Sequence, residues 1–118
     1  MISHPHFYTT HLEWARIFGC PVYFCADDGE WLNREDEGGV RKGFRGVKEI
    51  GEVGGEVKVI QCGGHFDGSA VLLWEKKLFI ADTFMSVPVS CVILWLFSVM
   101  MLIMRSLGST TRIVCWVP

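Results

Sequence analysis

Three histidines and one aspartate stand in positions where they could act together on a metal ion. His4 and His6 lie two residues apart near the amino end, and His65 follows paired glycines in the segment CGGHFDGS. Asp82 follows the apolar run LFIA. Neutral imidazoles and carboxylates are good zinc ligands, and a site with three protein ligands keeps a fourth position for water. The chemistry open to these residues is therefore metal-assisted hydrolysis.

Short strands are expected on both sides of His65 and just before Asp82. Residues 57–62 and 69–74 are rich in β-branched or bulky apolar side chains and are bounded by glycine-containing turns. Residues 78–81 make a third such run. His65 would then lie in the loop between the first two strands, and Asp82 directly after the third. Both side chains should therefore meet at the rim of one small sheet.

The amino-terminal histidines are expected to face the same way. Residues 3–8 are predicted to be extended, because Pro5 fixes its own φ and disfavours helical backbone in the residue before it. Side chains two residues apart in an extended chain point to one side. His4 and His6 should therefore present their imidazoles together.

A helix, a strand and a second short helix are expected to follow. The run THLE at residues 10–13 fits a capping box and places His11 in the first helical turn. Residues 21–26 have the composition of a strand. Asp27 or Asp28 is then suited to cap a short helix. These elements all follow the two amino-terminal histidines in the sequence.

Length and composition indicate a single domain with ordinary surface charge. The chain has 118 residues, a formal net charge of −2 and a pI near 6.0, so nucleic acid is not an expected partner. Residues 33–56 mix glycines with charges of both signs and show little periodicity, which predicts a flexible insert. The five cysteines are scattered and contain no CxxC, so we expect reduced, buried thiols.

Taken together, the segments SHPHFYTTH, CGGHFDGS and LFIADT resemble the metal-binding elements of the metallo-β-lactamase superfamily. The likeness covers about residues 1–85, with the insert matching poorly. His4 and His6 match the first two histidines of the family's HxHxDH motif, and His65 matches the next histidine ligand. Asp82 matches the aspartate that bridges two metal ions in that family.

The chain also departs from the family's pattern. Tyr8 and Thr9 stand where the motif has an aspartate and a histidine, although His11 lies close enough in sequence to supply a ligand. One zinc ion at most is therefore expected. The family fold is an αββα sandwich of two similar halves, and the strands expected before SHPH and after ADT are missing. The resemblance thus implies an α/β (α+β) fold, a truncated part of that sandwich.

The carboxyl-terminal third is apolar and has three interpretations. Residues 83–104 carry no charge, and the segment 86–105 is long enough for a transmembrane helix. It could associate with a membrane through residues 87–104, or form a buried helix that covers the sheet. Alternatively, the sequence after about residue 89 is not genuine coding sequence. Residues 106–118 form a tail.

No signal peptide pattern is visible at the amino end. We therefore expect a membrane location if the apolar segment inserts, and a cytoplasmic location otherwise.

The resemblance implies a zinc-dependent hydrolase acting on a small-molecule substrate. Zinc held by His4, His6 and His65 would supply a hydroxide that attacks an ester, thioester or amide, and Asp82 would be the catalytic group that orients it. The alternative is a non-catalytic, membrane-associated remnant whose ligand residues persist without the geometry for catalysis.

Overall fold

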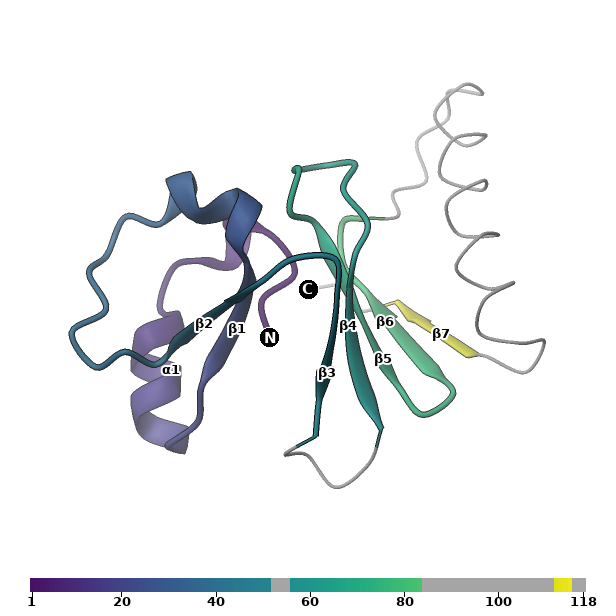
Figure 1. Ribbon diagram of the computed structural model, residues 1–118, viewed down its shortest axis with the longest axis horizontal. Coiled ribbons are helices and arrows are strands. Elements are labelled where there is room, and N and C mark those ends of the chain that lie inside the picture. The colour runs from purple at the N-terminus through teal and green to yellow at the C-terminus, as the bar shows by residue number, and fades with distance from the viewer. Residues whose placement is uncertain (52–55, 84–111, 116–118) are drawn as a thin grey trace.

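A computed structural model describes residues 1–51, 56–83 and 112–115 (Figure 1). These residues form a mixture of helix and sheet in which strands predominate, as expected for the α+β class. Three short helices occur in the described part of the chain. They are η1 (Pro5–Phe7), α1 (His11–Phe18) and η2 (Ala26–Trp31), of which η1 and η2 are 3-10 helices.

The strands form two sheets. In the smaller sheet β1 (Val22–Cys25) pairs in parallel with β2 (Arg41–Phe44). The larger sheet begins with four antiparallel strands, β3 (Val47–Ile50), β4 (Val57–Gln61), β5 (Ala70–Trp74) and β6 (Lys77–Ile80). Its fifth strand, β7 (Arg112–Cys115), runs parallel to β6. Figure 1 shows α1 beside the small sheet, and the larger sheet on the other side of the amino terminus.

The strands predicted around the candidate site are confirmed as β4, β5 and β6, each within one residue at either end. Their apolar residues alternate between two faces, as a paired strand requires. Val71 and Leu73 of β5 belong to one apolar cluster, whereas Ala70, the first residue of the strand, belongs to another. The larger sheet is therefore packed on both faces.

The prediction of a flexible insert at residues 33–56 is wrong for its second half. Residues 41–44 and 47–50 are the strands β2 and β3, and each pairs with a strand outside the insert. Phe44 and Ile50 are buried and belong to the same cluster as Tyr23. The two strands bury only one side chain each, so their order comes mainly from backbone pairing.

Two local predictions near the amino end are also wrong. Residues 5–7 form a 3-10 turn, so the segment 3–8 is extended only at its start, where His4 has φ −166° and ψ 170°. Helix α1 occurs where expected, but the Thr10 side chain makes no capping hydrogen bond. Glu13 instead pairs with Arg16, one turn further along the helix. The helix therefore begins where the sequence predicted, but the capping box does not form.

The amino-terminal segment bridges the two sheets. The Ile2 N–H donates a 2.8 Å hydrogen bond to the carbonyl of Tyr23 in β1. The Ser3 carbonyl accepts another of 2.8 Å from the N–H of Ala70, the first residue of β5. Figure 1 shows this segment running between the sheets. Residue 4 is thereby held beside the loop that precedes β5.

The predicted membrane segment 86–105 lies outside the described residues. Among those that are described, no helix has the length and apolar character needed to cross a bilayer. Of the predicted tail 106–118, the structure describes only the backbone of β7. Among the cysteines with described side chains, Cys25 is buried as expected, whereas Cys20 is exposed and the expectation of burial is wrong for it.

Candidate metal centre

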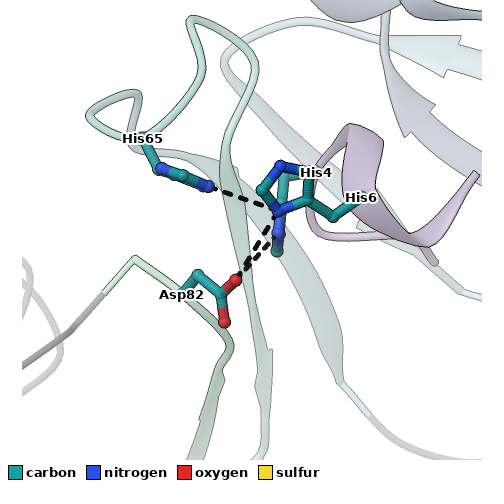
Figure 2. Close-up of side chains that lie close together, drawn as sticks. All are labelled: His4, His6, His65 and Asp82. Atoms are coloured by element: carbon teal, nitrogen blue, oxygen red, sulfur yellow. Dashed lines mark hydrogen bonds and ion pairs between the residues drawn. The ribbon is translucent and has the colours of Figure 1, made fainter.

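The structure brings four of the predicted ligands to one place. His4, His6, His65 and Asp82 each offer a ligand atom, and these atoms all lie within 4.8 Å of one another. The side chains come from three separate segments of the chain and converge from different sides (Figure 2). His4 directly precedes the η1 turn and His6 lies in its middle, whereas His65 comes from the β4–β5 loop and Asp82 from just after β6.

Specific contacts define the cluster. The Asp82 Oδ2 atom lies 3.2 Å from His4 Nε2 and 3.9 Å from His6 Nδ1. His6 Nδ1 is also 3.4 Å from His65 Nε2. Two imidazole nitrogens at this separation either share a proton or bind a common cation, because two unprotonated nitrogens repel each other. The facing atoms are thus arranged as a donor set for one positive charge.

His4 is the buried member of the set. Its side chain is 1% exposed, and its Nδ1 lies 2.9 Å from the Ser3 hydroxyl. Its Nε2 is buried and makes no hydrogen bond of acceptable geometry, although it is close to Asp82. Burial lowers the pKa of His4, and this outweighs the opposing effect of the Asp82 carboxylate. The neutral imidazole, which is the metal-binding form, is therefore favoured.

Backbone conformation positions His65. Gly63 and Gly64 precede it with φ of 67° and 101°, values that residues with a side chain rarely adopt. The N–H groups of Cys62 and Gly63 both donate to the Ser69 carbonyl, which closes the loop at its base. The paired glycines thus turn the chain sharply at the end of β4 and bring His65 over the amino-terminal segment.

An aromatic side chain that sequence analysis did not single out packs against the histidines. The Phe66 ring lies 5.8 Å from His4, 5.1 Å from His6 and 4.7 Å from His65, measured between ring centroids. Trp31, the last residue of η2, contacts the same ring at 5.6 Å. Phe66 therefore shields one side of the cluster, and its position directly after His65 was the only sequence signal for this role.

Helix η2 also contacts the His65 loop through polar groups. The Asp28 carboxylate accepts a 2.8 Å hydrogen bond from the N–H of Gly68. The Gln61 amide donates to Asp27 at 2.8 Å and to the Asp67 carbonyl at 2.9 Å. The sequence had suggested Asp27 or Asp28 as a helix cap, but Cys25 occupies the N-cap position. Both aspartates instead connect η2 to the loop.

His11 does not join the cluster in the described part of the structure. Its Nδ1 lies 2.9 Å from the Tyr8 carbonyl, and its Nε2 accepts a 2.8 Å hydrogen bond from Arg41 Nε. A carbonyl and a guanidinium fix the imidazole as the neutral tautomer that carries its proton on Nδ1. Burial lowers the pKa of His11 further. The residue therefore ties helix α1 to β2, and the expectation that it could supply a ligand is not met.

A cavity of about 430 Å³ lies against residues next in sequence to two members of the cluster. Its wall includes Ser3 and Ala81, the neighbours in sequence of His4 and Asp82. The remaining wall is mostly apolar and includes Phe7, Ala70, Leu72, Trp74, Phe79 and Ile80. The Phe7 ring also contacts His4, at 4.9 Å between centroids. None of the four cluster residues lines the cavity itself, which is mostly apolar and large enough for a small organic group.

Comparison with known proteins gives a partial relative. No protein-family model matches the chain. The uncharacterized protein YmaE of Bacillus subtilis (strain 168) is 39% identical over 75 residues, which make up 64% of this chain and 26% of that protein. The chain thus spans about a quarter of the length of the curated relative it matches. The relative's name states no activity.

Proposed function

We propose that this chain is a metal-dependent hydrolase domain of the metallo-β-lactamase type, with one zinc ion held by His4, His6 and His65. The observation that carries this proposal is the convergence of these histidines with Asp82, their ligand atoms lying within 4.8 Å of one another. Convergence of distant residues is far more specific than the HxH spacing alone. The partial αββα sandwich that the sequence resemblance implies belongs to the same proposal.

The donor set fits a zinc ion on the evidence of its own atoms. His4 Nε2 is buried without a hydrogen bond, a costly arrangement that a cation would relieve. Its other nitrogen contacts the Ser3 hydroxyl, as is usual for a histidine ligand whose second nitrogen is hydrogen bonded. His6 and His65 are exposed, so an ion can reach the cluster from solvent. Three imidazoles leave a fourth position open.

Different residues of the chain would have different roles in hydrolysis. A bound zinc ion supplies Lewis-acid chemistry, which polarises a carbonyl group and acidifies water. Asp82 is partly exposed and contacts both amino-terminal histidines. Its Oδ2 can orient an attacking water and hold the proton that this water gives up. Phe66 and Phe7 exclude bulk water from His4.

The cavity beside the cluster indicates the kind of substrate. Its walls carry no charged side chain, so an apolar acyl or aryl group fits it better than a charged one. The proposed substrate is a small molecule with an apolar substituent next to its carbonyl.

Metal content tests the proposal directly. We expect the purified chain to hold about one equivalent of zinc by atomic emission, and His65→Ala to hold much less. Asp67→Ala is the matched control, because Asp67 is an exposed acidic residue of the same loop outside the cluster. Zinc absent from the unmodified protein, or unchanged in His65→Ala, would refute the proposal. The four residues would then be a non-catalytic polar cluster.

A further inference from the structure

Asp28 is a buried carboxylate outside the metal-binding cluster. It is 1% exposed, and only one of its oxygens, Oδ1, is hydrogen bonded, to the N–H of Gly68. Its Oδ2 is buried without a hydrogen-bond partner. Burying a carboxylate with so few hydrogen bonds is unfavourable, so its presence calls for a compensating role.

The contact between Asp28 and Gly68 is unusually close. A Cβ atom on residue 68 would lie 2.6 Å from both Cγ and Oδ2 of Asp28, and 2.8 Å from Cβ of Cys25. Only glycine therefore lets the loop backbone rest directly on the carboxylate. The short helix η2 and the end of the β4–β5 loop are fitted to each other at this point.

The same loop carries His65, and its internal hydrogen bonds make it one unit. The Ser69 hydroxyl accepts from the Phe66 N–H at 2.9 Å, and the Ser69 N–H donates to the Phe66 carbonyl at 3.0 Å. Gly68 lies between these residues. A displacement of Gly68 therefore moves Phe66 and, with it, His65. Trp31 adds a second contact from η2, against the Phe66 ring.

We infer that Asp28 is a positioning residue for the metal centre, holding His65 at the distance needed for binding by accepting the hydrogen bond from Gly68. This inference rests on the proposed metal-binding function. Asp28 touches none of the four ligands in the contacts described, and it acts through the loop backbone. The second contact, between Trp31 and Phe66, supports the same loop position.

The role requires an acceptor at Oδ1 and does not require a charge. Burial raises the pKa of Asp28, and the nearby carboxylates of Asp67 and Asp27 act in the same direction. Asparagine keeps an acceptor oxygen of the same reach without the charge. Asp28→Asn should therefore preserve the loop position, whereas Asp28→Ala removes the acceptor.

Zinc affinity and the visible spectrum of the cobalt-substituted protein test the inference. We expect Asp28→Ala to weaken zinc binding about tenfold, near the lower end of what lost outer contacts cost a metal site. Its cobalt spectrum should shift toward that of His65→Ala. Asp28→Asn should bind within about threefold of the unmodified protein and keep its spectrum. Glu30→Ala is the matched control, since it removes an exposed carboxylate from the same short helix and should have little effect.

Each result separates positioning from simple support of the fold. If Asp28→Ala lowers the melting temperature but keeps the zinc affinity and cobalt spectrum, the inference is overturned while the proposed function stands. Absence of zinc from the unmodified protein would refute both the inference and the proposed function. Should Asp28→Ala fold poorly, Trp31→Ala provides the second variant, because this exposed side chain contacts Phe66 from the same helix. Unchanged zinc affinity and spectrum in a folded Trp31→Ala would also count against the inference.

Discussion

His4 Nε2 lies 3.2 Å from Asp82 Oδ2, yet the two atoms do not form a well-directed hydrogen bond. The buried imidazole is held on its other side by the Ser3 hydroxyl, so its Nε2 remains aimed at the space shared with His6 and His65. A nitrogen so placed is suited to a ligand that approaches from that space.

The first prediction concerns the charge of Asp82. Asp82→Asn keeps the shape of the side chain but removes the base that would accept a proton from water. We expect ester hydrolysis by the zinc-loaded protein to fall about 100-fold or more, as measured by kcat. Asp67→Asn removes an exposed charge from the His65 loop and should leave kcat unchanged. Equal rates for both variants would show that Asp82 has no part in the reaction.

A second prediction links metal binding to folding stability. A ligand that binds only the folded state at 100 times its Kd raises the free energy of unfolding by about 2.7 kcal/mol. Chelation of zinc should therefore lower the urea midpoint of the unmodified protein. His6→Ala should remove this dependence with little effect on the metal-free midpoint, because the His6 side chain is 57% exposed. A urea midpoint that is the same with and without chelator would contradict a contribution of zinc to folding stability.

The third prediction addresses the tight contact at Gly68. Gly68→Ala forces a Cβ atom against Asp28 and Cys25, which should destabilise the fold by about 1–3 kcal/mol. Gly29→Ala is the control, since a Cβ there meets nothing within 4 Å. Its effect should stay within about 1 kcal/mol of either sign. Denaturant titration measures the free energy of unfolding of both variants. Equal destabilisation by the two substitutions would mean that the loop shifts to relieve the contact at Gly68.

A fourth prediction follows from the protonation state of His11. Its folded pKa lies below the ordinary value of 6.5, so the unfolded chain takes up a proton more readily. The stability that His11 contributes is therefore present above pH 6.5 and is lost as the pH falls through its folded pKa. His11→Gln, which keeps an acceptor for Arg41, should make the unfolding free energy less dependent on pH between 7.5 and 5.5.

The free energy of unfolding of the unmodified protein and of His11→Gln should be compared at each pH in metal-free samples. The difference between them isolates the contribution of His11. The lowered pKa of His4 acts in the same direction, and the raised pKa of Asp28 acts in the opposite direction, but both groups are present in each protein. Parallel curves of unfolding free energy against pH would show that His11 does not contribute.

The fifth prediction concerns the apolar cavity. If an acyl group enters it, a butyrate ester should be hydrolysed with a higher kcat/KM than the matching acetate ester. Two buried methylene groups correspond to about 1.6 kcal/mol, or roughly a tenfold preference. Both kcat/KM values should be measured with zinc present, after subtraction of the hydrolysis rate that remains when zinc is chelated. Equal kcat/KM values would place the acyl group outside the cavity.

Sequence by itself determined the four candidate ligand residues and the strands next to two of them. Residues 57–62, 69–74 and 78–81 carry strong apolar patterns, so β4, β5 and β6 could be placed, and His65 and Asp82 fell at their ends. These signals are local, because turn glycines and alternating side chains act within a few residues. The family resemblance added the expectation that the histidines converge.

Tertiary structure alone decided how the segments meet. The amino-terminal histidines face the cluster through a 3-10 turn, and the segment is held by hydrogen bonds to β1 and β5 that no local pattern encodes. The strands β2 and β3 were missed because their order comes from pairing with distant partners. The contact of Asp28 with Gly68 joins residues far apart in the chain. Burial and backbone pairing between distant segments, which one sequence does not reveal, fixed these features.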